Sequence, residues 1–336
     1  MTIDLTTKYL GLELANPLVP SSNPLTGKLD SLKRLEDAGA AAVVLPSLFE
    51  EQIEHEEIEI ARLYDYQSDS FAESLGYFPE MDTYNTGPEK YLELVADAKK
   101  QLGIPVIASL NGTSKGGWVR YAQEIQQAGA DALELNIYVV PTDVLETSRD
   151  VEAGYCELIQ AVRQETTIPI AVKMGPFFSA LPNLADQFSR AGADGLVLFN
   201  RYLEPDIDLE NLCFSPELLL SRPDELRRTL RWIAILRDQV FISLAATSGI
   251  HTTEDALKAL LVGADVTMMA SALLQRGPAV IKLILSEMTT WLEERGYSSV
   301  RQMQGSMSRL RAAEPEKLER SNYMQALTSF TFQEKW

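Results

Sequence analysis

The sequence predicts an α/β fold, a (β/α)8 TIM barrel, on three observations. Eight apolar runs of strand length occur along the 336 residues, and nearly all of them follow an amphipathic helical stretch. Eight alternating units favour a closed barrel over an open doubly wound sheet. The G-x-G-x-x-G turn that an open dinucleotide-binding sheet places after an early strand is absent from the sequence.

The boundaries between the predicted helices and strands follow two local patterns. Four helical stretches end at a glycine and continue directly into an apolar run, at Gly39, Gly129, Gly192 and Gly263. Glycine just past a helix end is typical of a left-handed C-cap, and the short link leads into a buried parallel strand. Two other helices end at Ile-Pro, where proline stops the helix and an extended run begins. The predicted strands span residues 18–21, 42–47, 105–111, 131–137, 169–174, 194–200, 240–245 and 265–271.

Four segments do not belong to the minimal barrel. Residues 3–15 alternate in a β pattern and predict a hairpin that closes the bottom of the barrel. Long insertions at 48–88 and 201–222 follow the second and sixth strands, at the strand ends where barrel active sites are built. Connections of this length usually serve as lids or binding loops. The tail, 312–336, follows a single barrel domain of residues 1–311 and either packs on a neighbouring subunit or is solvated.

The composition excludes several classes of protein. Thirty Lys and Arg against 48 Asp and Glu leave a net charge of −18, which argues against nucleic acids and anionic membranes as partners. Two histidines and two cysteines make neither a multi-histidine metal centre nor a disulfide framework. No apolar run is long enough to span a bilayer, and the N-terminus has no signal-peptide core. We therefore expect a cytoplasmic protein without a metal site.

Lys173 is the most informative residue at the predicted strand ends. It places an ammonium group in the mostly apolar strand AVKMG, where burial requires a compensating partner. One interpretation is a cation beside the electron-rich edge of a bound flavin. A second is a Schiff-base amine, as in aldolases, and a third is a structural ion pair with Glu134 on the neighbouring strand.

A second signal lies after the last two predicted strands, where barrels often hold a phosphate. Thr247-Ser248-Gly249 and Ala270-Ser271 offer small residues and hydroxyl groups that let a backbone approach phosphate oxygens, although simple turn chemistry would use the same residues. Asn136 and Asn200 could bind a ring or serve as helix caps. We expect His251 to lie on the surface and Cys156 in the core, and nothing near Cys213 indicates a reactive thiol.

In this order the motifs resemble the flavin-dependent dihydroorotate dehydrogenases, nearest the soluble class I branch, over residues 5 to about 310. The resemblance is carried by the segments GLELANPLVPSSN, ALELNI, PIAVKM, LFN, LSRPDELRRTLR and SGIHTTEDALKALLVGADVTMMASALLQRGPAVI. It implies an FMN cofactor, a homodimer and a small-molecule substrate. It also implies that Lys173 contacts the flavin, that Asn136 and Asn200 bind substrate, and that Gly249 and its neighbours hold the phosphate. The residues assigned to the cofactor are Ser21, Ser22, Ser109, Asn136, Lys173, Ser221, Ser248, Gly249, Ala270 and Ser271.

The departures from the family pattern concern proton removal and substrate binding. Where the resemblance implies a catalytic Cys or Ser base, this chain carries Val139, which cannot accept a proton. Tyr138, Thr113 and Ser114 are candidate replacements, and Tyr138 joins Lys173 as a candidate catalytic residue. Leu45 or Pro46 stands where the family has a lysine, Arg222 replaces a glycine, and the loop 73–79 lacks its leading asparagine.

The resemblance implies an FMN-dependent oxidoreductase that oxidises dihydroorotate to orotate in pyrimidine synthesis, with hydride transfer to flavin N5. The missing base leaves two alternatives open. One is a flavoprotein with another substrate, or without turnover and docked on a redox partner protein. The other is a Schiff-base lyase that uses Lys173.

Overall fold

A computed structural model describes residues 3–53, 87–201, 204–215 and 218–319 of the chain. Eight parallel strands form one sheet in the order β3-β12-β11-β8-β7-β6-β5-β4. The two end strands approach each other, and the backbone N–H of Ala41 donates to the carbonyl of Leu18 at 3.0 Å. The predicted (β/α)8 barrel is therefore confirmed. Its strands are β3 (Leu18–Pro20), β4 (Val43–Phe49), β5 (Val106–Asn111), β6 (Ala132–Asn136), β7 (Ile170–Met174), β8 (Gly195–Leu198), β11 (Ser243–Ala246) and β12 (Val266–Met269).

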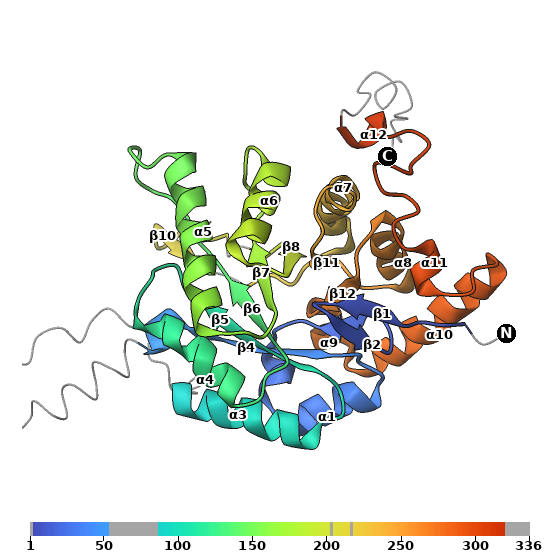
Figure 1. Ribbon diagram of the computed structural model, residues 1–336, viewed down its shortest axis with the longest axis horizontal. Coiled ribbons are helices and arrows are strands. Elements are labelled where there is room, and N and C mark those ends of the chain that lie inside the picture. The colour runs from blue at the N-terminus through green and yellow to red at the C-terminus, as the bar shows by residue number, and fades with distance from the viewer. Residues whose placement is uncertain (1–2, 54–86, 202–203, 216–217, 320–336) are drawn as a thin grey trace, which may run out of the picture.

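Helices follow the strands and surround them (Figure 1). The predicted glycine caps are present: Gly192 and Gly263 end their helices at φ of 112° and 118°, a conformation that L-residues with a side chain adopt only under strain. The long helices are α1 (Leu29–Asp37), α3 (Pro88–Gln101), α4 (Tyr121–Gln127), α5 (Ser148–Glu165), α6 (Leu181–Ala191), α7 (Leu226–Leu236), α8 (Thr253–Val262) and α10 (Ala279–Glu294). Shorter ones are η1 (Pro24–Gly27), η2 (Gly117–Arg120), η3 (Pro223–Glu225), α9 (Ser271–Arg276), α11 (Val300–Met303) and α12 (Glu316–Glu319).

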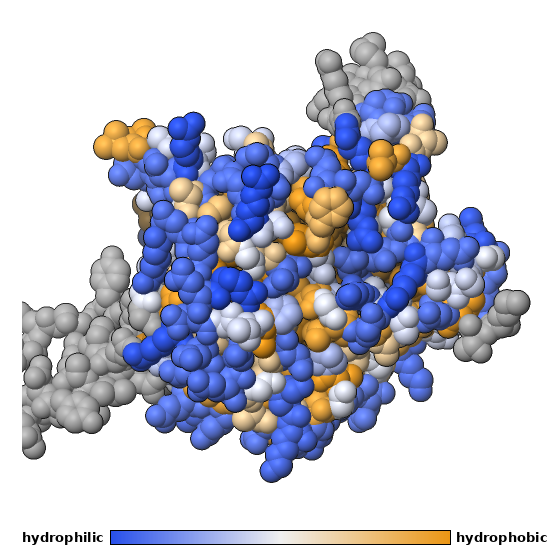
Figure 2. All heavy atoms as spheres, viewed as in Figure 1, coloured by the Kyte–Doolittle hydropathy of each residue, from blue (hydrophilic) through white to orange (hydrophobic). Residues whose placement is uncertain are grey.

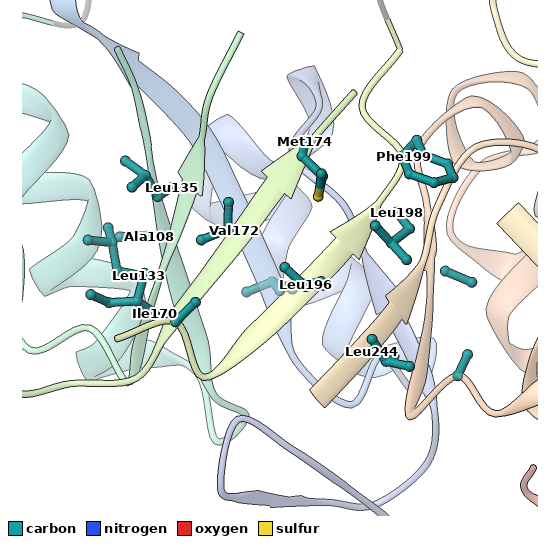
Figure 3. Packing of buried hydrophobic residues seen from close by; sticks show 14 of the residues in the cluster. Ala108, Leu133, Leu135, Ile170, Val172, Met174, Leu196, Leu198, Phe199 and Leu244 are labelled. Carbon is teal, nitrogen blue, oxygen red and sulfur yellow. The ribbon is translucent and has the colours of Figure 1, made fainter. Parts of the chain in front are cut away.

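Alternation along the strands divides the apolar residues into two cores. Leu133 and Leu135 on β6, with Ile170 and Val172 on β7, belong to the larger core between the strands and the helices (Figure 3). Residues that alternate with them along the strands, such as Ala132 and Ala171, belong to a smaller core inside the barrel. Since successive side chains of a strand point to opposite faces, the near-continuous apolar runs are explained by burial on both faces.

An N-terminal hairpin closes one end of the barrel, as predicted. Strands β1 (Thr7–Tyr9) and β2 (Leu12–Leu14) pair in antiparallel fashion, and the hairpin lies across the strands in the centre of Figure 1. Tyr9, Leu10 and Leu14 pack with the smaller core inside the barrel. The backbone N–H of Leu10 donates to Ser243 Oγ at 2.9 Å, which holds the tip of the hairpin against β11.

We expect Leu14→Ala to lower the free energy of unfolding by about 2–5 kcal/mol, because it removes a fully buried side chain and leaves a cavity. Leu14 is 2% exposed. Urea denaturation followed by circular dichroism measures the change. Lys8→Ala, at an exposed position of the same hairpin, is the control and should change stability by less than about 0.5 kcal/mol. Equal losses in the two variants would contradict the assignment of the hairpin as part of the core.

The other predicted segments are described only in part. The insertion after β8 contains a small antiparallel pair, β9 (Asp206–Asp208) with β10 (Cys213–Ser215). Most of the insertion at 48–88 lies outside the described residues, as does most of the tail, of which α12 contacts α7. On the face shown in Figure 2, hydrophilic residues predominate and hydrophobic ones form small separate patches. None of the helices that the structure describes is long and apolar enough to cross a bilayer.

Candidate active site

The side chain of Lys173 lies inside the barrel and donates two hydrogen bonds. Its ammonium donates to Glu134 Oε1 at 3.2 Å and to Ser21 Oγ at 3.4 Å. The register of β6 and β7 pairs Asn136 with Lys173 and Glu134 with Ala171, so the inward-facing side chains of adjacent strands meet. Lys173 is 7% exposed and Glu134 is fully buried. The ion pair expected as the structural interpretation of Lys173 is therefore present.

This ion pair does not use all the hydrogen-bonding capacity of its members. An ammonium has three N–H groups, and the two contacts with described residues leave one of them for another acceptor. Glu134 Oε2 is buried and has no hydrogen-bond partner among the described residues. An ion pair requires the protonated ammonium, whereas a Schiff-base nucleophile requires the neutral amine. The geometry therefore favours a fixed positive charge over a nucleophile.

The two asparagines predicted to bind substrate lie together beside this cluster. Asn200 Nδ2 donates to Asn136 Oδ1 at 2.8 Å, and the backbone N–H of Asn200 donates to the carbonyl of Met174 at 2.8 Å. Asn136 is the last residue of β6 and Asn200 follows the end of β8 by two residues, and both are half-buried. Neither one caps a helix here. The rim thus presents amide groups next to a buried cation.

Ser109 lies on β5, three strands from β8 in the sheet, and its hydroxyl is hydrogen-bonded to the Ser47 hydroxyl at 2.8 Å. Pro46 interrupts the β4–β5 ladder, where the register shifts between Val44 and Ser47, because proline has no N–H to donate. At this point the Tyr91 hydroxyl provides hydrogen bonds to β5: it accepts from the Ser109 backbone N–H and donates to the Ser109 carbonyl. Burial raises the pKa of this phenol far above its ordinary value. Tyr91 therefore serves as a neutral structural link.

The predicted phosphate turn brings together three segments of the chain. The backbone N–H of Ser221 donates to Ser271 Oγ at 2.9 Å, and the N–H of Gly249 lies 3.4 Å from Ser221 Oγ. Gly249 has φ of 87°, and a Cβ there would lie 2.7 Å from the backbone nitrogen of Leu226. Only glycine fits this turn without a shift of the neighbouring backbone.

The start of α9 provides donors beside this turn. The first N–H groups of a helix have no acceptor within the helix, and Ala270, the N-cap residue of α9, supplies no side-chain cap. Ser271 is the first residue of α9, and Ser248 adopts a left-handed φ of 65° next to Gly249. Small residues, hydroxyls and N–H groups are what a bound phosphate requires, so the described residues fit the phosphate of FMN.

His251 corrects one expectation from the sequence. We expected it on the surface, but it is 8% exposed, and its Nε2 lies 3.2 Å from Ser221 Oγ. His251 is buried because the 201–222 segment folds back and places Ser221 against this turn. No local sequence pattern predicts such a contact. Cys156 is half-buried against the large core, and burial raises the pKa of its thiol. Cys213 is exposed on β10.

Glu50 organises the loop after β5, and the sequence analysis missed it. This buried carboxylate accepts from the backbone N–H groups of Thr113 (2.8 Å) and Ser114 (3.3 Å), and also from the Ser114 hydroxyl. Glu50 follows β4 at the start of an acidic stretch, where it was indistinguishable from solvated neighbours. Glu50 therefore fixes the backbone of this loop at both residues and also accepts from the hydroxyl of Ser114.

The segment after β6 carries the predicted departures from the family pattern. The backbone N–H of Ile137 still donates to the carbonyl of Lys173, at 3.1 Å, and the chain then leaves the sheet. Tyr138 and Val139 are half-buried, and Val139 packs against the large core. Val140 is 57% exposed. The residue at the expected base position is therefore an apolar, half-buried side chain that packs against the larger core.

A cavity of about 220 Å³ adjoins the asparagine pair. Phe177, Arg201 and Arg228 contribute to its walls together with Asn200 and Ser248. Arg201 is held by Glu225 at 3.0 Å, and Arg228 lies over the Phe177 ring. Lys173 is not among the lining residues, so the cavity lies beside Asn200 and Ser248 and not against the ammonium. The described residues include no group of three or more His, Cys, Asp or Glu side chains suited to a metal ion.

Comparisons with known proteins agree with this arrangement. The sequence profile of the dihydroorotate dehydrogenase family matches residues 4–292. The catalytic subunit of dihydroorotate dehydrogenase B (NAD(+)) from Thermoplasma acidophilum is 26% identical over 309 residues, 90% of this chain and 98% of that protein. Its counterpart from Pyrococcus abyssi is 28% identical over 311 residues, with 90% and 98% covered.

A differently named enzyme is similarly related. The NAD-dependent dihydropyrimidine dehydrogenase subunit PreA of Escherichia coli is 26% identical over 330 residues, which cover 91% of this chain and 77% of PreA. The family match spans most of the chain, and its barrel carries the lysine, asparagine and phosphate-turn residues at one rim. The chain therefore belongs to the dihydroorotate dehydrogenase family of flavin-dependent dehydrogenases.

Proposed function

We propose that this protein is an FMN-dependent oxidoreductase whose flavin lies at the barrel rim, with its pyrimidine edge against Lys173. The observation that carries the proposal is the buried ammonium with an N–H group left over, beside the Asn136–Asn200 pair. A fixed cation favours negative charge that develops on the group it faces. Ser21 holds the ammonium from β3, and Ser22, half-buried next to it, provides a small side chain along the ring.

The phosphate of FMN would be held by Gly249, Ala270 and Ser271, with Ser221 and Ser248 beside them. Flavin, when bound, accepts a hydride from the substrate at N5. The residues of this chain bind and orient: the asparagine amides can bind the carbonyl and N–H edges of a substrate ring, and Lys173 supplies positive charge. Ser109, tied to Ser47, would support the ring from β5.

We propose a 5,6-dihydropyrimidine ring as the substrate, with dihydroorotate the first candidate. The names of the relatives support this class, since two are dihydroorotate dehydrogenases and PreA is a dihydropyrimidine dehydrogenase subunit. Oxidation of the C5–C6 bond requires a base that takes the C5 proton as C6 gives up hydride. Val139 cannot be that base. Tyr138 is the candidate that remains in this segment, and a homodimer remains the expected assembly.

The departure at Val139 supports a second candidate, a flavoprotein with another substrate or one that docks on a redox partner. PreA is named as a subunit, which is consistent with a partner protein. In this second case the flavin binds as proposed, and dihydroorotate leaves it oxidised.

The visible spectrum of the purified protein, followed by anaerobic addition of dihydroorotate, tests both candidates. A yellow protein with flavin bands that bleach on addition supports dihydroorotate as substrate. A yellow protein that stays oxidised with dihydroorotate but bleaches with dihydrouracil supports another dihydropyrimidine. A colourless protein that takes up neither FMN nor riboflavin would contradict the proposed function.

A further inference from the structure

The Ser221–His251 pair is a buried polar contact at the phosphate turn. Ser221 is 7% exposed and His251 is 8% exposed, and Ser221 Oγ lies 3.2 Å from His251 Nε2. The pair joins the 201–222 segment to the turn after β11, while the backbone of Ser221 is fixed by Ser271 at the start of α9. Both side chains therefore lie against the residues that fit a phosphate.

The hydrogen bonds of Ser221 Oγ depend on the protonation of His251. A hydroxyl has one O–H donor and two acceptor lone pairs. The Gly249 N–H occupies one lone pair. When His251 Nε2 carries a proton, this N–H donates to the second lone pair of Ser221 Oγ. The Ser221 O–H group must then donate to an acceptor other than His251. When Nε2 lacks a proton, it accepts from Ser221, and this donor is lost to a ligand. A neutral ring can adopt either form, whereas the imidazolium always donates from Nε2.

The charged side chains around His251 are already engaged. On α8, Asp255 accepts from the backbone N–H groups of His251 and Thr252. On α9, Arg276 donates to the His251 carbonyl at 3.0 Å, and on α10 Glu287 accepts from the Thr253 hydroxyl. Beyond these, Glu225 on η3 pairs with Arg201, and Asp224 pairs with Arg222. No carboxylate of a described residue is hydrogen-bonded to the imidazole, and the nearby Asp255 carboxylate contacts the backbone of His251 instead of its ring.

We propose that His251 is a positioning residue for the FMN phosphate: its protonated ring fixes Ser221 Oγ so that the hydroxyl donates to a phosphate oxygen. This inference rests on the proposed function, because it requires the phosphate at this turn. It makes FMN affinity depend on pH, with tighter binding in the protonated state. Riboflavin, which lacks the phosphate, is bound without this dependence.

Flavin fluorescence titrations of the apoprotein between pH 6 and pH 8 test the inference. We expect the wild type to bind FMN about tenfold more tightly at pH 6 than at pH 8, the size of one hydrogen bond to a charged group. His251→Gln keeps a donor of similar reach without a titrating charge, so it should bind FMN with little pH dependence. His251→Ala should bind FMN about tenfold more weakly at pH 6, and riboflavin should be bound equally by all three.

Nuclear magnetic resonance provides a test in which His251 itself is left unchanged. The chain has only two histidines, so the ring signals of His251 can be assigned with His55→Gln as reference. FMN should shift the ring signals of His251 toward those of the imidazolium, because an adjacent phosphate favours the charged ring. Riboflavin should leave these signals unchanged.

The failures of the two proposals are distinguishable. FMN binding that is equally pH-dependent in the wild type and His251→Gln would overturn the role of His251 alone. The same pH dependence for riboflavin would also overturn it, because the phosphate would not be involved. If the apoprotein bound neither flavin, the proposed function would fail, and this inference with it.

Discussion

Replacing Lys173 by methionine is expected to slow the reduction of bound flavin by substrate by about 10²–10³-fold, the typical cost of removing one fixed donor where charge develops. Methionine keeps the length and apolar stem of the side chain but removes the ammonium that Glu134 and Ser21 hold in place. Anaerobic stopped-flow measurement of flavin bleaching gives the rate. Measurement at saturating FMN separates slower flavin reduction from weaker binding of FMN.

The substitution also has a structural cost that must be separated from the rate. Glu134 is fully buried, and removal of one member of a buried ion pair typically costs about 3–5 kcal/mol because it leaves an uncompensated charge. The double variant Lys173→Met/Glu134→Gln removes that charge. We expect it to recover most of the lost stability in urea denaturation, while flavin reduction stays as slow as in the single variant.

A lysine at a remote ion pair provides the matched control. Lys99 Nζ contacts Asp131 at 2.6 Å, and Lys99→Met makes the same chemical change at the end of α3. Its flavin reduction should equal that of the wild type. If Lys173→Met reduced its flavin as fast as Lys99→Met, Lys173 would be a structural residue only, and the flavin would not lie against it.

The barrel was predictable because its signals are local. Glycine C-caps such as Gly192, and proline after a helix, mark the start of each buried strand, and apolar runs mark its course. The largest boundary error falls on β11, predicted at 240–245 and observed as Ser243–Ala246. Val240 is buried in the large core without belonging to the sheet. An apolar run reports burial, whereas a strand also requires a hydrogen-bonded neighbour.

The site was predictable only where its residues lie at strand ends. Lys173, Asn136 and Asn200 follow from the rule that polar residues at the C-terminal ends of barrel strands face the active site, and the structure brings them together. Glu50 and His251 did not follow from it. Each is buried by a loop from another unit of the barrel: Glu50 by the loop after β5, and His251 by the segment that returns Ser221 to the turn. Contacts of that kind are tertiary and leave no periodic pattern.

The departure at Val139 predicts a gain of function. We expect Val139→Cys to raise the rate at which dihydroorotate reduces the flavin by about 10²–10⁴-fold, the typical contribution of a general base. The backbone N–H of Ile137 is still hydrogen-bonded to β7. Position 139 is therefore only two residues beyond a fixed point of the sheet and three beyond Asn136. A thiolate there could accept the C5 proton that valine cannot.

The pH dependence and the neighbouring position make this prediction specific. The rate in Val139→Cys should rise with pH toward the ordinary thiol pKa of about 8.5, while the slow wild-type rate should not follow that curve. Val140→Cys is the matched control, since Val140 is 57% exposed whereas Val139 packs against the core. A thiol at 140 faces solvent and should add nothing. Equal rates for both variants and the wild type would show that the missing base is not what limits dihydroorotate oxidation. A substrate other than dihydroorotate would then account for the cation and amides at the rim.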